Sequence, residues 1–456
     1  MARRRKLYLA VDVGGTKILA ALVDASGMVL RREKHATPRE GGPDVLCAAL
    51  KEAVEQVVHK TSGVAMKHVV ALGIGVPGIV DPDEGLVIVT PNMGLSNTRL
   101  GQFCKKTFGL PTVVGNDCNL GILGEKWLGS ARGAASAMGI LVGTGVGGGF
   151  IQGSRVWLGA RGMASEIGHI VMEINGPLCG CGNRGCLEAL ASRTAIERDL
   201  REAIAAGRTS VLTELLEGRL DVIRSSVLRR ALAAGDTLVT EVLRHAADVL
   251  GHACLTVEHL LDPEAIVFGG GVIEACSEFM LPIIQEVVAG DCLTAPSPGG
   301  SLLVSSLGDD AVLLGATAAA RLHLGENPLK KRFQVAPSYP VIERRKSGVY
   351  EVGFHVLETD FHVTACGQAK RQKSSPEPSD ATGRRQLTRH HLERPCRGGP
   401  HVLFVATGPS GDIALSDDAC LYLRQRAIEW QSLPTDDALR AYNEFPGRKA
   451  ALVHLT

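Results

Sequence analysis

The stretch LYLAVDVGGTKILAALV, residues 7–23, sets the structural pattern of this chain. Leu7–Val13 is an alternating, β-branched run, a Gly-Gly-Thr turn interrupts it, and Ile18–Val23 runs back. Two such runs joined by a glycine turn are typical of a β-hairpin. The stretch therefore predicts an antiparallel strand pair.

A second stretch repeats this pattern further along the chain. Ala137–Val142 and Gly149–Ile151 flank the glycine-rich run GTGVGG at 143–148. We expect a second strand, turn and strand here. The likeness hints at a duplicated architecture, although it is weak as a sequence repeat.

Strands and helices are expected to alternate between and after these two hairpins. Further buried strands are predicted at 69–76, 112–114 and 265–268. Helical spacing or composition predicts helices at 43–60, from Asn116-Asp117 onward, and at 236–261, 276–288 and 312–322. Such alternation indicates α/β layers.

The composition is that of an ordinary globular protein. The chain has 456 residues, 45% of them hydrophobic and 21% charged, with a net charge of +1. Two or three domains are expected at this length. The balanced charge and the 4% of aromatic residues argue against a nucleic-acid or membrane partner. Without an export signal or a long apolar run, we expect a cytoplasmic protein whose scattered cysteines stay reduced.

The composition shifts near residue 330. Residues 368–400 are rich in Lys, Arg, Ser, Pro and His, which predicts a linker or a long exposed loop. A second compact unit is expected after it, with strands at 401–406 and 450–456 and helices at 416–426 and 434–444.

The most specific chemistry lies in EIGH at 166–169 and CGCGNRGCLE at 179–188. One imidazole and three thiols form a complete ligand set for a tetrahedral structural zinc, namely His169, Cys179, Cys181 and Cys186. Four unrelated buried residues are the alternative, which the tight spacing disfavours. Two carboxylates, those of Glu166 and Glu188, flank the ligands, so zinc would also hold two polar groups in place.

The turn in Asp12-Val-Gly-Gly-Thr-Lys17 can present backbone N–H groups and a hydroxyl to phosphate oxygens, with Asp12 near Mg²⁺. A plain tight hairpin is an equally good interpretation of this motif alone. The run GTGVGGG at 143–149 is a second phosphate-binding candidate. It is not a dinucleotide fingerprint, because a strand follows the glycines instead of a helix.

Asp117, in the run NDCN at 116–119, stands where a strand meets a helix. A helix cap is the commoner role for a lone aspartate there. The functional interpretation is a general base that takes a proton from a substrate hydroxyl. Glu125, further along the same helix, is predicted to be solvated or salt-bridged.

Taken together, these motifs resemble the ROK family, the bacterial sugar kinases and sugar-responsive repressors of the actin and hexokinase superfamily. The resemblance spans about residues 6–325. The motifs occur in the family's order: DVGGTK at 12–17, GVPGIVD at 75–81, PN at 91–92, NDCN at 116–119, GTGVGGG at 143–149, SEIGH at 165–169, CGCGNRGCLE at 179–188 and FGGGV at 268–272.

The resemblance implies an α/β fold of two RNase H-like, actin- or hexokinase-type lobes with a ligand cleft between them. The first lobe would comprise 1–115 with a returning helix at about 308–325, and the second 116–307. It implies Asp117 as catalytic base. Sugar contacts would come from Asn92, Asn116, Asp117, Glu166, His169 and Glu188. Nucleotide contacts would come from Asp12, Gly14, Gly15, Thr16, Lys17, Thr144, Gly145, Gly147, Gly270 and Gly271.

The chain departs from the family pattern at a few places. Cys118 stands where the family usually has Ala, and Ser165 where it has Gly. The segment after Asn92 lacks the usual tryptophan, which bears on the identity of the sugar. No helix-turn-helix precedes the first strand, which favours a kinase over a repressor.

Residues from about 338 to 456 are foreign to that family and resemble the small Mth938-like α/β domain. Within 326–456 we therefore expect a linker and an accessory module with no predicted chemistry. The whole chain is expected to be an ATP-dependent hexose kinase, most simply a glucokinase, with structural Zn²⁺, with Mg²⁺ bound to ATP, and as a homodimer. Alternatives are a sugar-sensing regulator, a kinase for an N-acetylhexosamine or fructose, or a zinc-stabilised scaffold.

Overall fold

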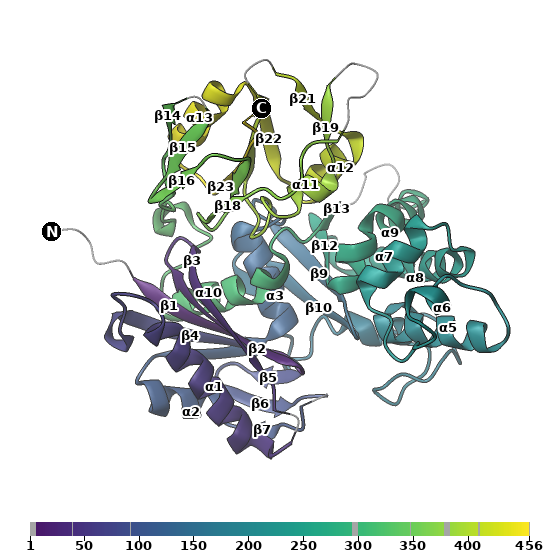
Figure 1. Ribbon diagram of the computed structural model, residues 1–456. Coiled ribbons are helices and arrows are strands. Elements are labelled where there is room, and N and C mark those ends of the chain that lie inside the picture. Colours follow the sequence, from purple (N-terminus) through teal and green to yellow (C-terminus); the bar gives the residue numbers. More distant parts are fainter. Residues whose placement is uncertain are drawn as a thin grey trace. The chain divides into compact units, whose positions relative to one another are not determined.

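The computed structural model describes residues 6–38, 40–91, 93–293, 300–346, 348–377, 384–408 and 411–455. The chain forms two compact units, one of Met1–Arg132 with Ser306–Thr456 and one of Gly133–Ser305. Figure 1 labels the helices and strands of each unit.

The first unit contains a five-stranded mixed sheet. Its order is β3-β2-β1-β4-β8, that is Val29–Ala36, Lys17–Asp24, Leu7–Val13, Val69–Val76 and Thr112–Asn116. The first three strands are antiparallel, and β4 and β8 run parallel to β1. The predicted hairpin of β1 and β2 is confirmed.

Helices cover both faces of this sheet (Figure 1). Residues 7, 9, 11 and 13 of β1 join a core with α1 (Gly42–His59) and α2 (Leu100–Phe108). Tyr8, which points to the other face, packs with Ala320 of α10 (Ala311–His323). Successive side chains of β1 therefore point to opposite faces of the sheet, and both faces are buried there.

Helix α10 packs directly on α3 (Asp117–Leu128). A Cβ atom added at Gly315 of α10 would lie 1.7 Å from the backbone oxygen of Leu120. Only glycine permits backbones this close. This packing places α3 in the first unit, whose first segment ends at Arg132, whereas the lobe boundary expected from the sequence lies at 115/116.

The second unit repeats the order of the first sheet. It runs β11-β10-β9-β12-β13, that is Arg155–Val156, Val146–Gln152, Ser136–Val142, Ala265–Gly269 and Ser301–Val304. Again three strands are antiparallel and two follow in parallel. The duplicated architecture and the α/β fold class are confirmed.

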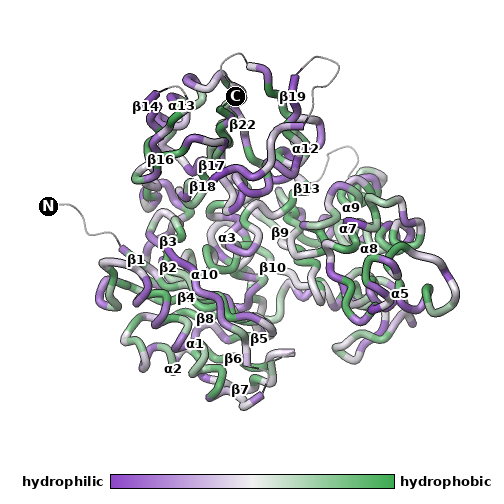
Figure 2. Tube along the Cα trace, in the orientation of Figure 1, coloured by the Kyte–Doolittle hydropathy of each residue, from purple (hydrophilic) through white to green (hydrophobic). Residues whose placement is uncertain are grey.

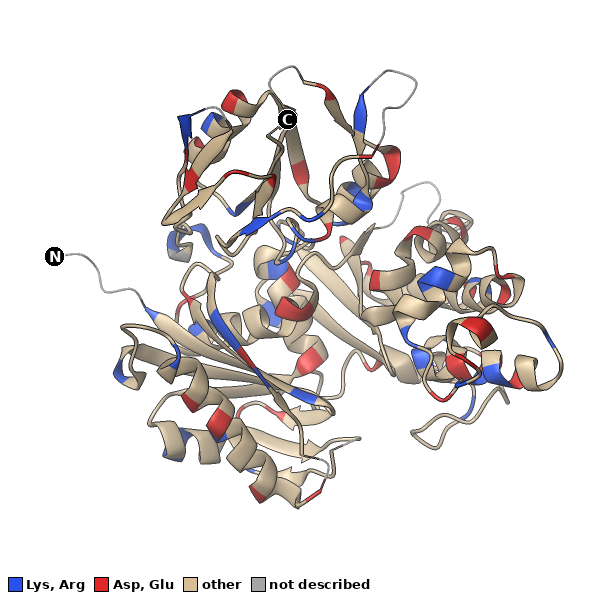
Figure 3. Cartoon of the chain, in the orientation of Figure 1, with Lys and Arg blue, Asp and Glu red and all other residues tan. Residues whose placement is uncertain are grey.

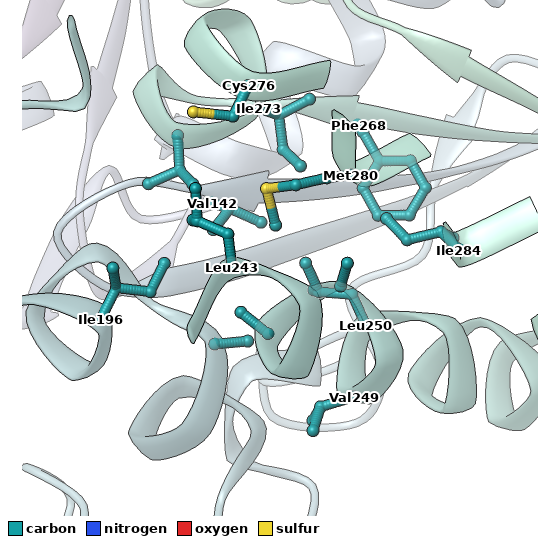
Figure 4. Close-up of a cluster of buried hydrophobic side chains, with 14 of the residues drawn as sticks. Val142, Ile196, Leu243, Val249, Leu250, Phe268, Ile273, Cys276, Met280 and Ile284 are labelled. Atoms are coloured by element: carbon teal, nitrogen blue, oxygen red, sulfur yellow. The ribbon is translucent and has the colours of Figure 1, made fainter. Parts of the chain in front are cut away.

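The second unit's sheet packs on a helical layer whose core is shown in Figure 4. Phe268 of β12, Leu250 of α8 and Met280 of α9 lie within it. Hydrophobic residues line α8 and α9 in Figure 2. The helices are α4 (Leu187–Ala191), α5 (Arg193–Ala205), α6 (Leu212–Leu215), α7 (Ser225–Ala233), α8 (Thr237–Leu261) and α9 (Gly271–Ala289).

Residues 338–456, the C-terminal module, belong to the first unit and contain a further five-stranded sheet. Its order is β18-β17-β23-β20-β22, that is Ala369–Arg371, Phe361–Val363, Lys449–Val453, Val402–Ala406 and Glu429–Leu433. Alternate residues of β20 enter different cores, with Phe404 in one and Leu403 in the other. This sheet is therefore buried on both faces.

Smaller elements complete the described chain. In the first unit outside the module they are η1 (Met66–His68), β5 (Ile79–Asp81), β6 (Leu86–Val89), β7 (Ser96–Thr98), η3 (Gly308–Asp310) and η4 (Lys331–Phe333). The second unit adds η2 (Ile167–His169). The module adds β14 (Ile342–Lys346), β15 (Val349–Val352), β16 (His355–Leu357), β19 (Arg385–Leu387), α11 (Arg389–Leu392), β21 (Ile413–Leu415), α12 (Asp417–Gln425) and α13 (Thr435–Glu444).

The prediction of a linker or long exposed loop at 368–400 is wrong for the described residues of this stretch. Strands β18 and β19 and helix α11 lie in this stretch, and Leu387 and Leu392 are fully buried. The stretch looks polar because its buried apolar residues stand singly among polar ones, some of which are themselves buried, such as Arg389 and His391.

Charged residues are interspersed over both units (Figure 3). No described helix combines the length and the apolarity needed to cross a bilayer.

Glu125 of α3 is not solvated as expected, because it is only 3% exposed. Its carboxylate accepts hydrogen bonds from Ser130 N (2.8 Å), Ser130 Oγ (3.0 Å), Leu307 N (3.0 Å) and Ser306 N (3.4 Å). Ser130 precedes the point where the chain leaves the first unit, and Ser306 follows the point where it returns. Glu125 therefore bonds both chain segments that connect the first unit to the second, the outgoing one and the returning one.

Glu125→Gln is expected to lower the free energy of unfolding by about 3 kcal/mol, because an amide NH₂ would face buried N–H donors. Urea unfolding followed by circular dichroism measures this. The matched control is Glu55→Gln on the exposed face of α1, which should change stability little. Equal stability of the two variants would contradict the role of Glu125.

Candidate active site

Two aspartates stand at the carboxyl ends of parallel strands in the first unit. Asp12 pairs with Gly75 of β4, and β4 in turn pairs with β8, after which Asp117 begins α3. Gly75 has no side chain to separate them, and a Cβ atom there would already lie 3.7 Å from the Cα atom of Asp117. Ligand sites in open α/β sheets form at such strand ends.

The charge of Asp117 affects the protonation of Asp12. Burial and, next, the negative charge of Asp117 raise the pKa of Asp12 to about 7. Burial also raises the pKa of Asp117, although the backbone N–H of Cys118, 2.8 Å from Oδ1, opposes this. Two acidic groups this close favour a bound cation or a shared proton.

Asp117 does not cap helix α3. The N-cap is Asn116, whose Oδ1 accepts from Asn119 N at 3.0 Å and whose Nδ2 donates to Gly78 O at 3.0 Å. The helix-cap interpretation of Asp117 is therefore wrong, and its Oδ1 instead accepts from the backbone N–H of Cys118. Asn116, expected to contact sugar, has a definite structural role.

The first glycine turn, Gly14–Thr16, is supported by residues that the sequence did not single out. Gly14 N donates to Lys17 O at 2.8 Å, and Thr37 Oγ1 donates to Gly14 O at 2.5 Å. Lys17 Nζ donates to Asp309 Oδ1 at 2.8 Å. Burial acts to raise the pKa of Asp309, but the Lys17 hydrogen bond and charge outweigh it and hold that pKa below its usual value.

The second glycine turn, Gly143–Gly145, lies against the start of α5. Thr194 Oγ1 donates to Thr144 O at 2.7 Å, and Arg193 Nη2 donates to Thr144 Oγ1 at 2.9 Å. Sequence reasoning missed Arg193. Its position directly after Ser192, the N-cap of α5, is a signal that could have drawn attention to it.

The loop after β12 reaches the same turn. Gly270 has a φ of 86°, and a Cβ atom there would lie 2.5 Å from Val142 O at the end of β9. Gly271 then begins α9 and Gly147 lies in β10. Two of the sequence motifs, GTGVGGG at 143–149 and FGGGV at 268–272, thus converge at one end of the second unit's sheet.

The four predicted zinc ligands lie together in the second unit. Their ligand atoms are all within 4.8 Å of one another. Cys181 Sγ lies 3.8 Å from Cys186 Sγ, and His169 Nδ1 lies 3.8 Å from Cys179 Sγ. A tetrahedral zinc with Zn–S bonds of about 2.3 Å requires S···S edges of about 3.8 Å. The donor set therefore fits zinc in both type and spacing.

The cysteine loop, Cys179–Cys186, is shaped by close backbone contact. Gly185 has a φ of 70°, and a Cβ atom there would lie 1.6 Å from Glu173 O. Cys179 N donates to Asn183 O at 2.8 Å and closes the loop. A side chain at position 185 would prevent this arrangement.

Glu188 connects the cysteine loop with the second glycine turn. Its Oε2 accepts from Val146 N at 3.0 Å, and Cys179 Sγ lies 3.7 Å from its Oε1. Glu166 precedes the short helix η2 that carries His169, and its carbonyl accepts from His169 N. Asn92, the remaining predicted sugar contact, lies outside the described residues.

The raised pKa of Asp12 predicts a pH-dependent stability. Its protonated form stabilises the fold, so this contribution is present at low pH and is lost as the pH rises through about 7. Without added Mg²⁺, thermal unfolding of the protein should become easier from pH 6 to pH 8, by at most about 1.4 kcal/mol per pH unit.

Asp12→Asn should flatten this dependence, because the amide does not titrate. Asp44→Asn, on the exposed first turn of α1, is the matched control and should leave the pH dependence unchanged. Melting curves of the three proteins across this range measure the difference. Parallel slopes for wild type and Asp12→Asn would refute it.

The repeated sheet order, with carboxylates and glycine turns at the strand ends, defines a two-lobed α/β fold of the hexokinase type. The chain belongs to the ROK family, whose sequence profile matches residues 8–322.

Similar proteins include both enzymes and regulators. The chain is 33% identical over 320 residues to the glucokinase of Thermotoga maritima, across 70% of this chain and 98% of that protein. It is 29% identical over 287 residues to the DNA-binding transcriptional dual regulator NagC of Escherichia coli, across 63% and 68%. The structure of a ROK family glucokinase from Streptomyces griseus with glucose and AMPPNP matches with 33% identity, a TM-score of 0.61 and coverage of 69% and 99%.

Proposed function

We propose that the chain is an ATP-dependent hexose kinase, most simply a glucokinase. The observation that carries this proposal is Asp117, a carboxylate at a strand end that is not consumed by capping its helix. The glucokinases similar to this chain support the substrate class, since the Streptomyces griseus enzyme is seen with glucose and AMPPNP.

In the proposed reaction Asp117 takes the proton of a sugar hydroxyl. The hydroxyl oxygen forms a bond to the γ-phosphorus of ATP, the bond from that phosphorus to the bridging oxygen breaks, and ADP leaves. The raised pKa of Asp117 brings the base closer to neutral pH, which favours proton transfer. Mg²⁺, for which Asp12 is the proposed neighbour, would neutralise charge on the phosphates.

The two glycine turns are proposed to bind the phosphates through their backbone N–H groups. In the first unit, the residues proposed to contact the phosphates are Gly14, Gly15, Thr16 and Lys17. In the second unit, they are Thr144, Gly145, Gly147, Gly270 and Gly271. Lys17 supplies a positive charge whose position is fixed by Asp309.

Sugar hydroxyls are proposed to bind Glu166, His169 and Glu188 in the second unit and Asn92 and Asn116 in the first. His169 Nδ1 lies on the side of the cysteine cluster, which leaves Nε2 as the nitrogen for sugar. A structural zinc would thus hold one wall of the pocket without entering the chemistry.

A sugar-sensing regulator is the second candidate, because NagC and other regulators share this family. ADP release from ATP across a panel of hexoses and N-acetylhexosamines separates the two. Turnover with glucose as the best substrate is expected. Binding of a sugar without turnover of any would overturn the kinase proposal in favour of the regulator. Replacing ATP by polyphosphate in the same assay identifies the donor.

Arg193 is expected to contribute to nucleotide affinity, because its guanidinium bonds the side chain of Thr144. Arg193→Gln should raise KM for ATP about tenfold and leave KM for the sugar unchanged, the loss expected for one charge-assisted contact. Arg201→Gln is the matched control. Both arginines lie near the carboxylate of Glu197, Arg193 at 3.2 Å and Arg201 at 3.8 Å. Arg201, however, donates to Asp221 O and not to the glycine turn. Equal KM values for ATP in the two variants would contradict the role of Arg193.

Other expectations from the sequence stay proposals. They are the Mth938-like nature of the C-terminal module, a homodimeric state and a cytoplasmic location.

A further inference from the structure

The return segment, Ser306–Asp310, is where the chain re-enters the first unit. It is held from inside that unit by Glu125, which accepts from the backbone N–H groups of Ser306 and Leu307. A second set of contacts reaches it from the C-terminal module. No sequence motif assigns a role to these contacts.

Two glycines of the module lie against the return segment. Gly398 and Gly399 have φ values of 81° and 62°. A Cβ atom at Gly399 would lie 2.8 Å from Leu307 Cδ2 and 2.9 Å from Ser306 Oγ. Position 399 of the module therefore lies against the side chains of the segment, and a larger residue there would displace them.

Arg448 fixes these glycines. It is 2% exposed, its Nε donates to Gly398 O at 2.9 Å and to Gly399 O at 3.0 Å, and its Nη2 donates to Gly398 O at 2.6 Å. Its Nη1 donates to Gly27 O at 3.3 Å, in the turn between β2 and β3. One buried guanidinium thus ties the module to the first sheet.

The return segment ends in two aspartates with different partners. Asp310 forms an ion pair with Arg32 of β3, and the positive charge of Arg448 also acts on it. Asp309 forms the ion pair with Lys17 beside the first glycine turn. Because both belong to the single turn η3, a shift of one moves the other.

The module also contacts the outgoing connection. Arg132, the last residue before the chain leaves the first unit, donates from Nη2 to Ala427 O at 3.0 Å. Both connections between the units are therefore touched by the module.

We propose that the C-terminal module is a positioning element for the phosphate site. Through Gly398, Gly399 and Arg448 it holds the return segment, and through Asp309 that segment holds Lys17. Arg448 is a positioning residue, since it acts through others and touches neither substrate nor the reacting atoms.

Hydrogen exchange of the full chain without ligand tests this coupling. In Arg448→Met, peptides covering 306–310 and 14–17 are both expected to exchange about tenfold faster than in wild type, because loss of the guanidinium frees the segment. Arg448→Lys should restore part of the protection. Faster exchange confined to 398–399, with 14–17 unchanged, would overturn the proposal.

Arg389→Met is the matched control. Arg389 is another buried arginine of the module, but it packs over Tyr422 and pairs with Glu393 within the module. It should leave exchange at 14–17 unchanged. If it accelerates that exchange as Arg448→Met does, general destabilisation explains the effect and the proposal fails. Should Arg448→Met not fold, Gly399→Ala, whose Cβ atom would press on Ser306 and Leu307 from the module, decides by the same two peptides.

The consequence for nucleotide affinity rests on the proposed kinase function. Arg448→Met should raise KM for ATP at least fivefold, about 1 kcal/mol, with KM for glucose unchanged. In an Asp309→Asn background the same substitution should have almost no further effect, because the link to Lys17 is already broken. If the two substitutions raise KM for ATP additively, Arg448 does not act through Asp309, and this part of the proposal is wrong. Absence of turnover in wild type would count against the kinase function alone, since the exchange experiment needs no substrate.

Discussion

Replacing Asp117 by asparagine is expected to slow sugar phosphorylation by about 10³-fold, the usual contribution of a general base. The amide cannot accept the proton of the sugar hydroxyl. It can still accept the hydrogen bond from Cys118 N, which lies 2.8 Å from Oδ1, so the start of α3 should keep its shape. A coupled assay for ADP at saturating sugar and ATP measures the change.

Two further measurements identify the cause of that loss. Calorimetric sugar binding and zinc content of Asp117→Asn should equal those of wild type. Asp44→Asn, an exposed aspartate of α1, should keep full activity. Near-normal turnover by the Asp117 variant would remove it from the mechanism and favour a different base.

Replacing Cys181 by serine is expected to release zinc and to weaken sugar binding about 10- to 100-fold, although Cys181 touches no proposed sugar contact. The reason is the connection through the cysteine loop. Cys181 Sγ lies 3.8 Å from Cys186 Sγ, and Cys179 of the same loop lies beside the carboxylate of Glu188. Loss of one ligand opens the tetrahedral set and frees Glu188 to move.

Cys292→Ser is the matched control, because Cys292 is also an exposed free cysteine but lies outside the cluster. It should keep both zinc and sugar affinity. Zinc is measured with a chelating dye and sugar affinity by calorimetry. If zinc-free Cys181→Ser binds sugar as tightly as wild type, the metal does not support the sugar pocket. If the wild-type protein contains no zinc, the metal assignment is wrong.

The sequence allowed prediction of those elements that rest on local patterns. Strands β1 and β2 alternate and are joined by glycines, and α8 has unbroken helical spacing. Strand β3 escaped notice because its residues RREKH are charged, as an edge strand with one open side permits. Strands β18 and β19 are three residues long each and carry arginines, so their apolar periodicity is too short to detect.

The candidate site shows the same division. The cysteine loop and His169 lie within one short stretch, so their spacing alone indicated a metal. Lys17 and Asp309 are 292 residues apart, and no local pattern can announce such a pair. Glu125 looked like an ordinary helical glutamate because most of its donors are backbone groups, which carry no sequence signature.

The way the second unit is inserted into the first has a consequence for synthesis on the ribosome. Gly133–Ser305 is one continuous stretch, and all five strands of its sheet have emerged once Val304 is outside. The first sheet still lacks α10, which covers β1 and β4 and is translated only at Ala311–His323. The inserted unit can therefore complete its core first, while the strands made earliest wait for a helix made after it.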